Sequence, residues 1–129
     1  MNAKQVIVMK KFASLRTGKY CAQASHASMG ALLSIGKFDG YGDNFIIPLH
    51  NPFVREWLTG AFKKVTLYVE TEEELLAIYE AARQASLPTS LIKDSGLTEF
   101  NGVPTLTAVG IGPADAFGID AITGHLKLF

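Results

Sequence analysis

The sequence contains little of what disulfide-bonded and membrane-spanning proteins are built from. Cys21 is the single cysteine among 129 residues, so no disulfide can form within the chain. No apolar run approaches the roughly 18 residues that a membrane-spanning helix needs. The four apolar residues 6–9 are too few for the hydrophobic part of a signal peptide. These absences predict a soluble, cytoplasmic protein with no membrane partner.

Residues that bind metals or belong to common reactive motifs are also scarce. The three histidines, at positions 26, 50 and 125, have no ligand-like spacing, so we expect no metal site. Ser25 does not lie in a G-x-S-x-G segment, which argues against a serine hydrolase of that type. The segment GIGP at 110–113 lacks the later glycine or lysine of a nucleotide-binding loop. A small nucleotide-binding protein is therefore disfavoured, and no cofactor is expected.

Acidic residues are absent from the first 38 positions. That segment holds six lysines and arginines and carries +6, whereas residues 39–129 hold six basic and twelve acidic side chains and carry −6. Such a split indicates a basic surface for an anionic partner. The alternative is that helix surfaces elsewhere, such as the ETEEE segment at 70–74, simply hold the acids. Charge alone leaves both interpretations open.

The order of apolar and turn-forming segments predicts one α/β domain over residues 1–129. Strand–helix–strand order favours largely parallel pairing. The last two strands have no helix between them, so they can pair antiparallel and make the sheet mixed. We expect strands at 4–10, 63–70, 88–94 and 105–112, helices at 18–35, 52–60, 72–87 and a short one from Pro113 onward, loops at 36–52 and 95–104, and an ambiguous tail at 124–129.

The helix predicted at 18–35 carries two stripes of different character. One stripe is polar, and the other consists mostly of small residues that allow close packing on a sheet. Cys21 lies about 140° from His26, so the two cannot form a thiol–imidazole pair, and we expect Cys21 to be buried. At 100° per residue, the polar stripe contains Lys19, Gln23, His26 and Gly30, and the small-residue stripe contains Tyr20, Ala24, Ala27, Ala31 and Ile35.

Lys19 has an unusual position in the first turn of this helix. The helix dipole disfavours a cation there by a few tenths of a kcal/mol up to about 1 kcal/mol. Lys19 together with the free amides of the helix N-terminus would suit a phosphate or a developing oxyanion. The alternative is a solvated lysine beside a loop, and the residue alone does not decide between them.

A second polar cluster, KDSGLTEF at 93–100, follows the third predicted strand. Asp94 ends that strand and Thr98 lies four residues later. Ligands gather at the carboxyl ends of parallel strands, so Asp94 and Lys19 share one end of the sheet if the first and third strands are parallel. A carboxylate and an ammonium placed there could polarise a water and hold an oxyanion. The alternative is that Asp-Ser-Gly is an ordinary turn.

Taken together, these segments resemble the type II peptidyl-tRNA hydrolase family. The resemblance covers most of the chain in the family's order. It implies a mixed four-stranded sheet flanked by helices in a three-layer α/β/α arrangement, a homodimer, and cleavage without a metal of the ester that joins a peptide to tRNA. The segments that carry it are KQVIVMKK, GKYCAQASHASMGAL, REWLTGAFKKVTLYV, SLIKDSGLTEF, PTLTAVGIGPA and ITGHLKLF.

The resemblance also implies roles for individual residues. Asp94 would orient or deprotonate the attacking water, and Lys19 would stabilise the oxyanion. Thr98 and Thr107 would donate or relay hydrogen bonds. Leu97 departs from the family, which often has a basic or polar residue there. Gln23 and His26 would line the substrate pocket, and Lys10, Lys11, Arg16 and Lys37 would contact tRNA phosphates.

A binding module is the competing hypothesis. The same fold could hold RNA or a partner protein without turnover, and Leu97 would then mark a lost contact. The presence of the complete set Lys19, Asp94, Thr98 and Thr107 favours the enzyme.

Overall fold

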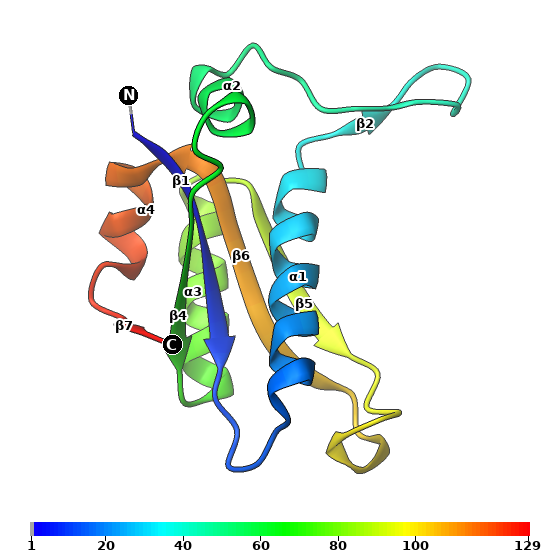
Figure 1. Cartoon of the computed structure of the whole chain (residues 1–129), viewed down its shortest axis with the longest axis vertical. Helices are drawn as coiled ribbons and strands as arrows, with labels where there is room; N and C mark the ends of the chain where they lie inside the picture. The colour runs from blue at the N-terminus through cyan, green and yellow to red at the C-terminus, as the bar shows by residue number, and fades with distance from the viewer. Residues whose placement is uncertain (1) are drawn as a thin grey trace.

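The structure, a computed structural model that describes residues 2–129, is built on a five-stranded sheet in the order β5-β6-β1-β4-β7 (Figure 1). The sheet strands are β1 (Ala3–Lys10), β4 (Lys64–Val69), β5 (Thr89–Asp94), β6 (Thr105–Asp115) and β7 (Lys127–Leu128), and a separate hairpin pairs β2 (Lys37–Phe38) with β3 (Phe45–Ile46). The helices are α1 (Thr17–Leu33), α2 (Pro52–Thr59), α3 (Glu72–Gln84) and α4 (Ala116–Thr123), with a 3₁₀ turn, η1, at Phe100–Gly102.

The sheet is mixed, as the sequence predicts, but it is less parallel than expected. Among the described residues, β1 and β4 form the one parallel pair, and every other pairing is antiparallel. The expectation of largely parallel pairing was therefore wrong, because β6 lies between β1 and β5. The expected four strands are joined by a fifth, β7, from the ambiguous tail at 124–129.

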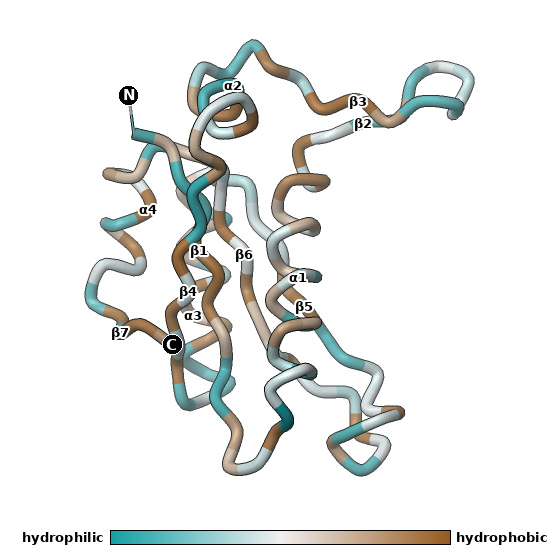
Figure 2. The backbone as a smooth tube through the Cα atoms, viewed as in Figure 1, coloured by the Kyte–Doolittle hydropathy of each residue, from teal (hydrophilic) through white to brown (hydrophobic). Residues whose placement is uncertain are grey.

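Helices cover both faces of this sheet, which confirms the predicted α/β class with helices flanking the sheet. Val6 and Val8 of β1 belong to the core cluster that includes α3 and α4. Ile7 and Met9 alternate with them and pack against α1. Both faces of β1 are therefore apolar, and its middle is brown in Figure 2. None of the helices in residues 2–129 combines the length and the apolar character that crossing a bilayer requires.

Helix α1 lies very close to β6. Its buried residues Gln23, Ala27 and Ala31 recur every four positions and face the sheet. A Cβ atom at Gly110 of β6 would come within 2.1 Å of the Ala27 carbonyl oxygen, so a glycine is required at this position. Close contact between α1 and the sheet follows from small residues on both sides of the interface.

Two helix starts have the caps that their sequences predict. Asn51 accepts hydrogen bonds from the amides of residues 53 and 54, with Pro52 at the first helical position of α2. Thr71 accepts from the Glu74 amide and its hydroxyl donates to the Glu74 carboxylate, at the spacing of a capping box. These local signals explain why the starts of α2 and α3 were predictable.

The segment 36–52, expected to be a loop, contains the β2–β3 hairpin. This arm projects from the C-terminal end of α1, away from the sheet (Figure 1). The Asp39 carboxylate closes its turn by accepting from the amides of Tyr41 and Asp43. Phe38 packs edge-on against Phe45, with 5.0 Å between ring centroids. These contacts stabilise the hairpin, which the prediction of a loop at 36–52 did not include.

The close approach of α1 generates a stability prediction. Gly110→Ala is expected to lower the free energy of unfolding by about 2 kcal/mol, because the new methyl group overlaps the Ala27 carbonyl. Urea unfolding monitored by circular dichroism measures the change. Gly118→Ala in α4 is the matched control, since a Cβ there meets nothing within 4 Å. Equal stability of the two variants would contradict the tight packing of α1 on β6.

Candidate active site

The candidate site lies where β5 ends and α1 begins. Side chains of β5 alternate between the two faces of the sheet, so Ser90, Ile92 and Asp94 share the α1 face. The Ser90 hydroxyl donates to the Ala27 carbonyl, and Ile92 packs in the α1 cluster. Because β1 and β5 are both antiparallel to β6, they run in one direction. Their carboxyl ends therefore lie at the same end of the sheet, where α1 starts (Figure 1).

Lys19 and Asp94 meet at this end of the sheet. Lys19 Nζ lies 2.7 Å from Asp94 Oδ2, and their side chains are only 16% and 10% exposed. Lys19 Nζ also donates to Thr98 Oγ1 at 2.9 Å. Its position in the first turn of α1 therefore has a structural reason, because the Asp94 carboxylate offsets the unfavourable helix dipole. The alternative of a solvated lysine is wrong.

Gln23 connects this ion pair to Thr107. Its amide nitrogen donates to Asp94 Oδ2 at 3.1 Å, and its amide oxygen accepts from the Thr107 hydroxyl at 2.6 Å. Gln23 and Thr107 are both almost fully buried. A buried amide with both ends bonded has one favoured orientation, so Thr107 fixes the side of Gln23 that faces Asp94.

A β-bulge turns Thr107 toward Gln23. Val109 lies in the core on the α3 face and Ala108 in the core on the α1 face, so simple alternation would place Thr107 with Val109. The register between β5 and β6 shifts after Ile92, and β6 contributes one extra residue there. Such bulges re-aim side chains, and this one brings Thr107 to the α1 face.

Gly96 is a site residue that the sequence analysis missed. Its amide donates to Asp94 Oδ1 at 2.8 Å. Its φ of +84° and a would-be Cβ only 2.4 Å from the Val103 carbonyl oxygen exclude other residues. The signal was present, because an aspartate two residues before a glycine is typical of a turn in which the carboxylate accepts a backbone amide.

These contacts keep the Asp94 carboxylate charged. The hydrogen bond from Lys19 and then the Gly96 amide lower the pKa of Asp94 below its ordinary value of 3.8. A carboxylate offers about four lone-pair positions, and the described residues occupy three of them. The remaining position, on Oδ1, is available to a water. Lys19 likewise has one N–H beyond its bonds to Asp94 and Thr98.

The other predicted basic residues lie around the site rather than in it. Lys10 Nζ sits 4.0 Å from the centroid of the Phe12 ring, and Lys11 Nζ sits 3.8 Å from that of Tyr68. Arg16 is exposed and pairs with Glu99 at 2.6 Å. Lys10 is the last residue of β1, and Lys11 and Arg16 lie in the segment between β1 and α1, at the same end of the sheet as Asp94. Lys37 is on the projecting arm, which follows the C-terminal end of α1, whereas the site lies at the N-terminal end of that helix (Figure 1).

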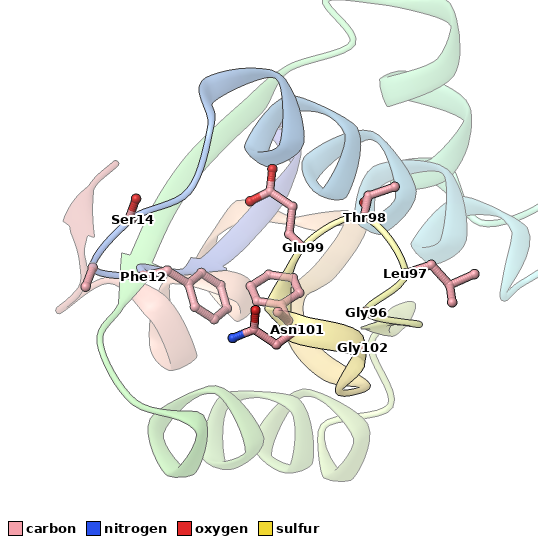
Figure 3. A pocket seen from close by; sticks show the side chains of 10 residues that line it. Phe12, Ser14, Gly96, Leu97, Thr98, Glu99, Asn101 and Gly102 are labelled. Carbon is pink, nitrogen blue, oxygen red and sulfur yellow. The ribbon is translucent and has the colours of Figure 1, made fainter.

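A hollow of about 530 Å³ lies beside Thr98 (Figure 3). Phe12 and the loop 96–102 line it, and the rings of Phe12 and Phe100 are 4.8 Å apart. Leu97 is 86% exposed and points away from the other labelled side chains in Figure 3. The residue that departs from the family pattern therefore lies at the rim of this hollow, with most of its side chain in solvent.

One expectation about α1 was wrong. Cys21 is exposed rather than buried, because it lies about 200° from Gln23 on the helix and so faces away from the sheet. Within the polar stripe, Gln23 is buried whereas His26 is exposed. His26 lies beside a second hollow, between α1 and β5. Within residues 2–129, no three His, Cys, Asp or Glu side chains are grouped closely enough to hold a metal ion.

Comparison with known proteins gives consistent matches over the whole chain. The family model described as Peptidyl-tRNA hydrolase PTH2 matches residues 3–129. A protein named "Peptidyl-tRNA hydrolase" from Methanopyrus kandleri is 42% identical over 125 residues, which cover 97% of each chain. One of the same name from Methanocaldococcus jannaschii is 41% identical over 126 residues, covering 97% of this chain and 98% of that one.

A solved structure supports the fold alone. It belongs to a protein of unknown function from Agrobacterium tumefaciens, with a TM-score of 0.54 and 17% identity, and the match covers 100% of this chain and 98% of that one.

The contacts of Asp94 predict how it titrates. Lys19→Met is expected to raise the pKa of Asp94 toward 3.8, because the largest cause of its lowering is removed. A carboxyl with a lowered folded pKa stabilises the fold above its unfolded pKa, and this contribution is lost as pH falls through the folded value. The stability advantage of the wild type over Lys19→Met therefore shrinks as pH falls below about 4.

Carbon-13 NMR of the Asp94 carboxyl and urea unfolding at several pH values measure these effects. Lys93→Met is the control, because Lys93 is exposed and its side chain lies on the opposite face of β5 from Asp94. An Asp94 titration that is the same in the wild type and in Lys19→Met would contradict the assigned ion pair.

Proposed function

This chain belongs to the peptidyl-tRNA hydrolase family and hydrolyses peptidyl-tRNA, and we propose that the reaction takes place at Lys19 and Asp94. The observation that supports this placement is the nearly buried ion pair between them. Each of the two groups also keeps one hydrogen-bonding position that none of residues 2–129 uses. A site with a free carboxylate lone pair and a free ammonium N–H suits the addition of water to an ester carbonyl.

In the proposed mechanism Asp94 acts on the water. A water that donates to Asp94 Oδ1 is oriented to attack the ester carbonyl carbon. The lowered pKa of Asp94 makes it a weak base, so its main contribution is to orient the water and to stabilise the positive charge that develops on it. The attacking water gives up one proton to solvent as its oxygen bonds to the carbonyl carbon. The bond from that carbon to the ribose oxygen then breaks, and the ribose oxygen takes one proton from solvent and leaves as the tRNA hydroxyl.

Lys19 and Thr98 act on the oxygens of the ester. The free N–H of Lys19 stabilises the oxyanion that forms as water adds. Thr98 accepts from Lys19 through its oxygen, so its own hydroxyl proton is available to a substrate oxygen. Thr107 is a positioning residue, because it reaches Asp94 only through Gln23. An ester already has a good leaving group, so no covalent intermediate with the protein is needed.

We propose that phosphates of the tRNA contact the basic residues around Lys19 and Asp94. Lys10 and Lys11 stand over aromatic rings and keep their charges free of carboxylate partners among the described residues. Arg16 is already paired with Glu99, so it would contribute less. Lys37 would contact tRNA only at a distance from the ester, since it lies on the arm. His26 would contact the peptide side of the substrate.

The remaining expectations stay predictions. The comparisons favour the hydrolase over a binding module that lacks turnover. We propose that residues 1–129 act as one catalytic domain, without a cofactor, in the cytoplasm where translation supplies the substrate. A homodimer, which the family resemblance implies, stays a prediction too. Phe38, Tyr41 and Ile46 on the arm are exposed apolar side chains that a second copy could cover.

Removing either charge of the ion pair is expected to abolish most of the activity. Asp94→Asn and Lys19→Met should each lower kcat/KM by about 100-fold or more. Release of an N-acetylated amino acid from tRNA, with EDTA present, measures the loss, and circular dichroism shows that each variant is folded. Asp43→Asn on the arm is the control. A folded Asp94→Asn variant with full activity would remove Asp94 from the mechanism.

Substrate binding is expected to weaken steeply as salt concentration rises, because phosphate contacts release counterions. Lys10→Gln and Lys11→Gln should each reduce the slope of log KM against log salt by about one. Arg83→Gln on α3 is the control, since Arg83 pairs with Glu80 on the same helix. A KM that does not respond to salt would contradict phosphate recognition.

A further inference from the structure

We propose that the peptide part of the substrate binds as an added strand on the free edge of β5. This inference rests on the proposed function, because it uses Asp94 as the reacting end of the site. Strand β5 is the first strand of the order β5-β6-β1-β4-β7, so in the described part of the chain no strand pairs with its other side. The strand ends at Asp94 itself. A peptide on this edge would therefore lead directly to the carboxylate.

The main-chain groups of this edge are available. The Pro88 carbonyl accepts from the Gly112 amide of β6. By the two-residue alternation of an antiparallel ladder, Ser90 and Ile92 then face β6, while Leu91 turns its amide and carbonyl outward. Among the described residues, no other segment bonds the outward amides and carbonyls of β5. An open row of this kind is a template for another extended chain.

A hollow beside this edge can hold the peptide's side chains. It has a volume of about 830 Å³ and lies between α1 and the outer edge of β5. Met29 and Leu33 on one side and Leu91 and Ile92 on the other give it an apolar lining, and Met29 is 58% exposed. His26 lies at the same hollow. This arrangement gives His26 a place on the peptide side of the site.

Recognition through main-chain groups fits this substrate chemically. Peptides of any sequence share the same amides and carbonyls, so an added strand binds them without reading their side chains. The peptide's last carbonyl must lie at Asp94, which is also the last residue of β5. The peptide therefore runs in the same direction as β5, as a parallel pair. In such a pair, alternate peptide residues direct their amides to the strand.

Substrate length and N-methylation test this pairing on the wild-type enzyme. From Thr89 to Asp94 the edge spans six residues, or about 20 Å. We expect kcat/KM to rise from N-acetyl-aminoacyl-tRNA to a peptide of about six residues and then to level off. N-methylation of alternate peptide amides should lower kcat/KM about five- to tenfold, with the intervening amides insensitive. Equal rates at all lengths, or no alternation, would overturn the proposal.

A pair of variants tests the strand itself. Leu91→Pro removes an outward N–H while leaving the bonds to β6 intact, and an edge strand tolerates proline at such a position. It should lower kcat/KM for tetrapeptidyl-tRNA about five- to tenfold and leave N-acetyl-aminoacyl-tRNA unaffected. Leu91→Ala keeps the N–H but shortens a side chain that lines the hollow, so it is the matched control for the lost side chain. The five- to tenfold loss expected from the missing N–H is the loss in Leu91→Pro beyond that in Leu91→Ala. If Leu91→Pro does not fold, the N-methylated substrates decide.

The outcomes separate this proposal from the proposed function. A folded wild type that fails to cleave N-acetyl-aminoacyl-tRNA would overturn the proposed function. Cleavage with no dependence on peptide length would leave the function standing and overturn the added strand. A Leu91→Pro variant with unchanged kinetics but an altered oligomeric state, measured by analytical ultracentrifugation, would assign the edge to a second copy of this chain and overturn the proposal.

Discussion

The structure around the site depends on one constraint, which is that the Asp94 carboxylate stays charged although its side chain is only 10% exposed. A charge removed from water is costly unless it is paired and hydrogen-bonded. Three donor groups meet that requirement: the side chains of Lys19 and Gln23 from α1, and the Gly96 amide from the loop that follows β5. The residue types needed at positions 19 and 23 of α1 are therefore set by a carboxylate that lies more than seventy residues later in the sequence.

The distance between α1 and the sheet decides whether Gln23 can serve this carboxylate. Its amide must reach Asp94 at one end and Thr107 at the other, on neighbouring strands. The helix can come this close because Ala27 faces Gly110, where any side chain would collide with the helix backbone. The geometry of the site therefore depends on how closely α1 packs on the sheet. Three small residues, Gly110, Ala27 and Ala31, allow that close packing.

Local patterns were enough to predict most helices and strands and the proximity of Lys19 and Asp94. That proximity was predicted by assuming that β1 and β5 run in the same direction within a largely parallel sheet, and the assumption about the sheet was wrong. The two strands share a direction because both are antiparallel to β6, not because the sheet is largely parallel. The orientation of Thr107 depends on a bulge, and a bulge depends on the register between two strands, which local patterning does not determine. The strands β2 and β3 of the hairpin in segment 36–52, and the strand β7, have two residues each. Such strands are too short to show a periodic pattern of apolar residues in the sequence.

The two edges of the sheet are treated differently, and this difference bears on function. The β4 edge is covered by β7, which brings the C-terminal segment back onto the sheet, with the Phe129 amide donating to the Thr66 carbonyl. The β5 edge has no such cover among the described residues, although an open edge invites unwanted pairing. The strand limits that risk with Pro88 before it and the exposed Lys93 near its end. An edge that is protected from aggregation but left uncovered, and that ends at the reacting carboxylate, is the arrangement expected of a surface that binds an extended chain.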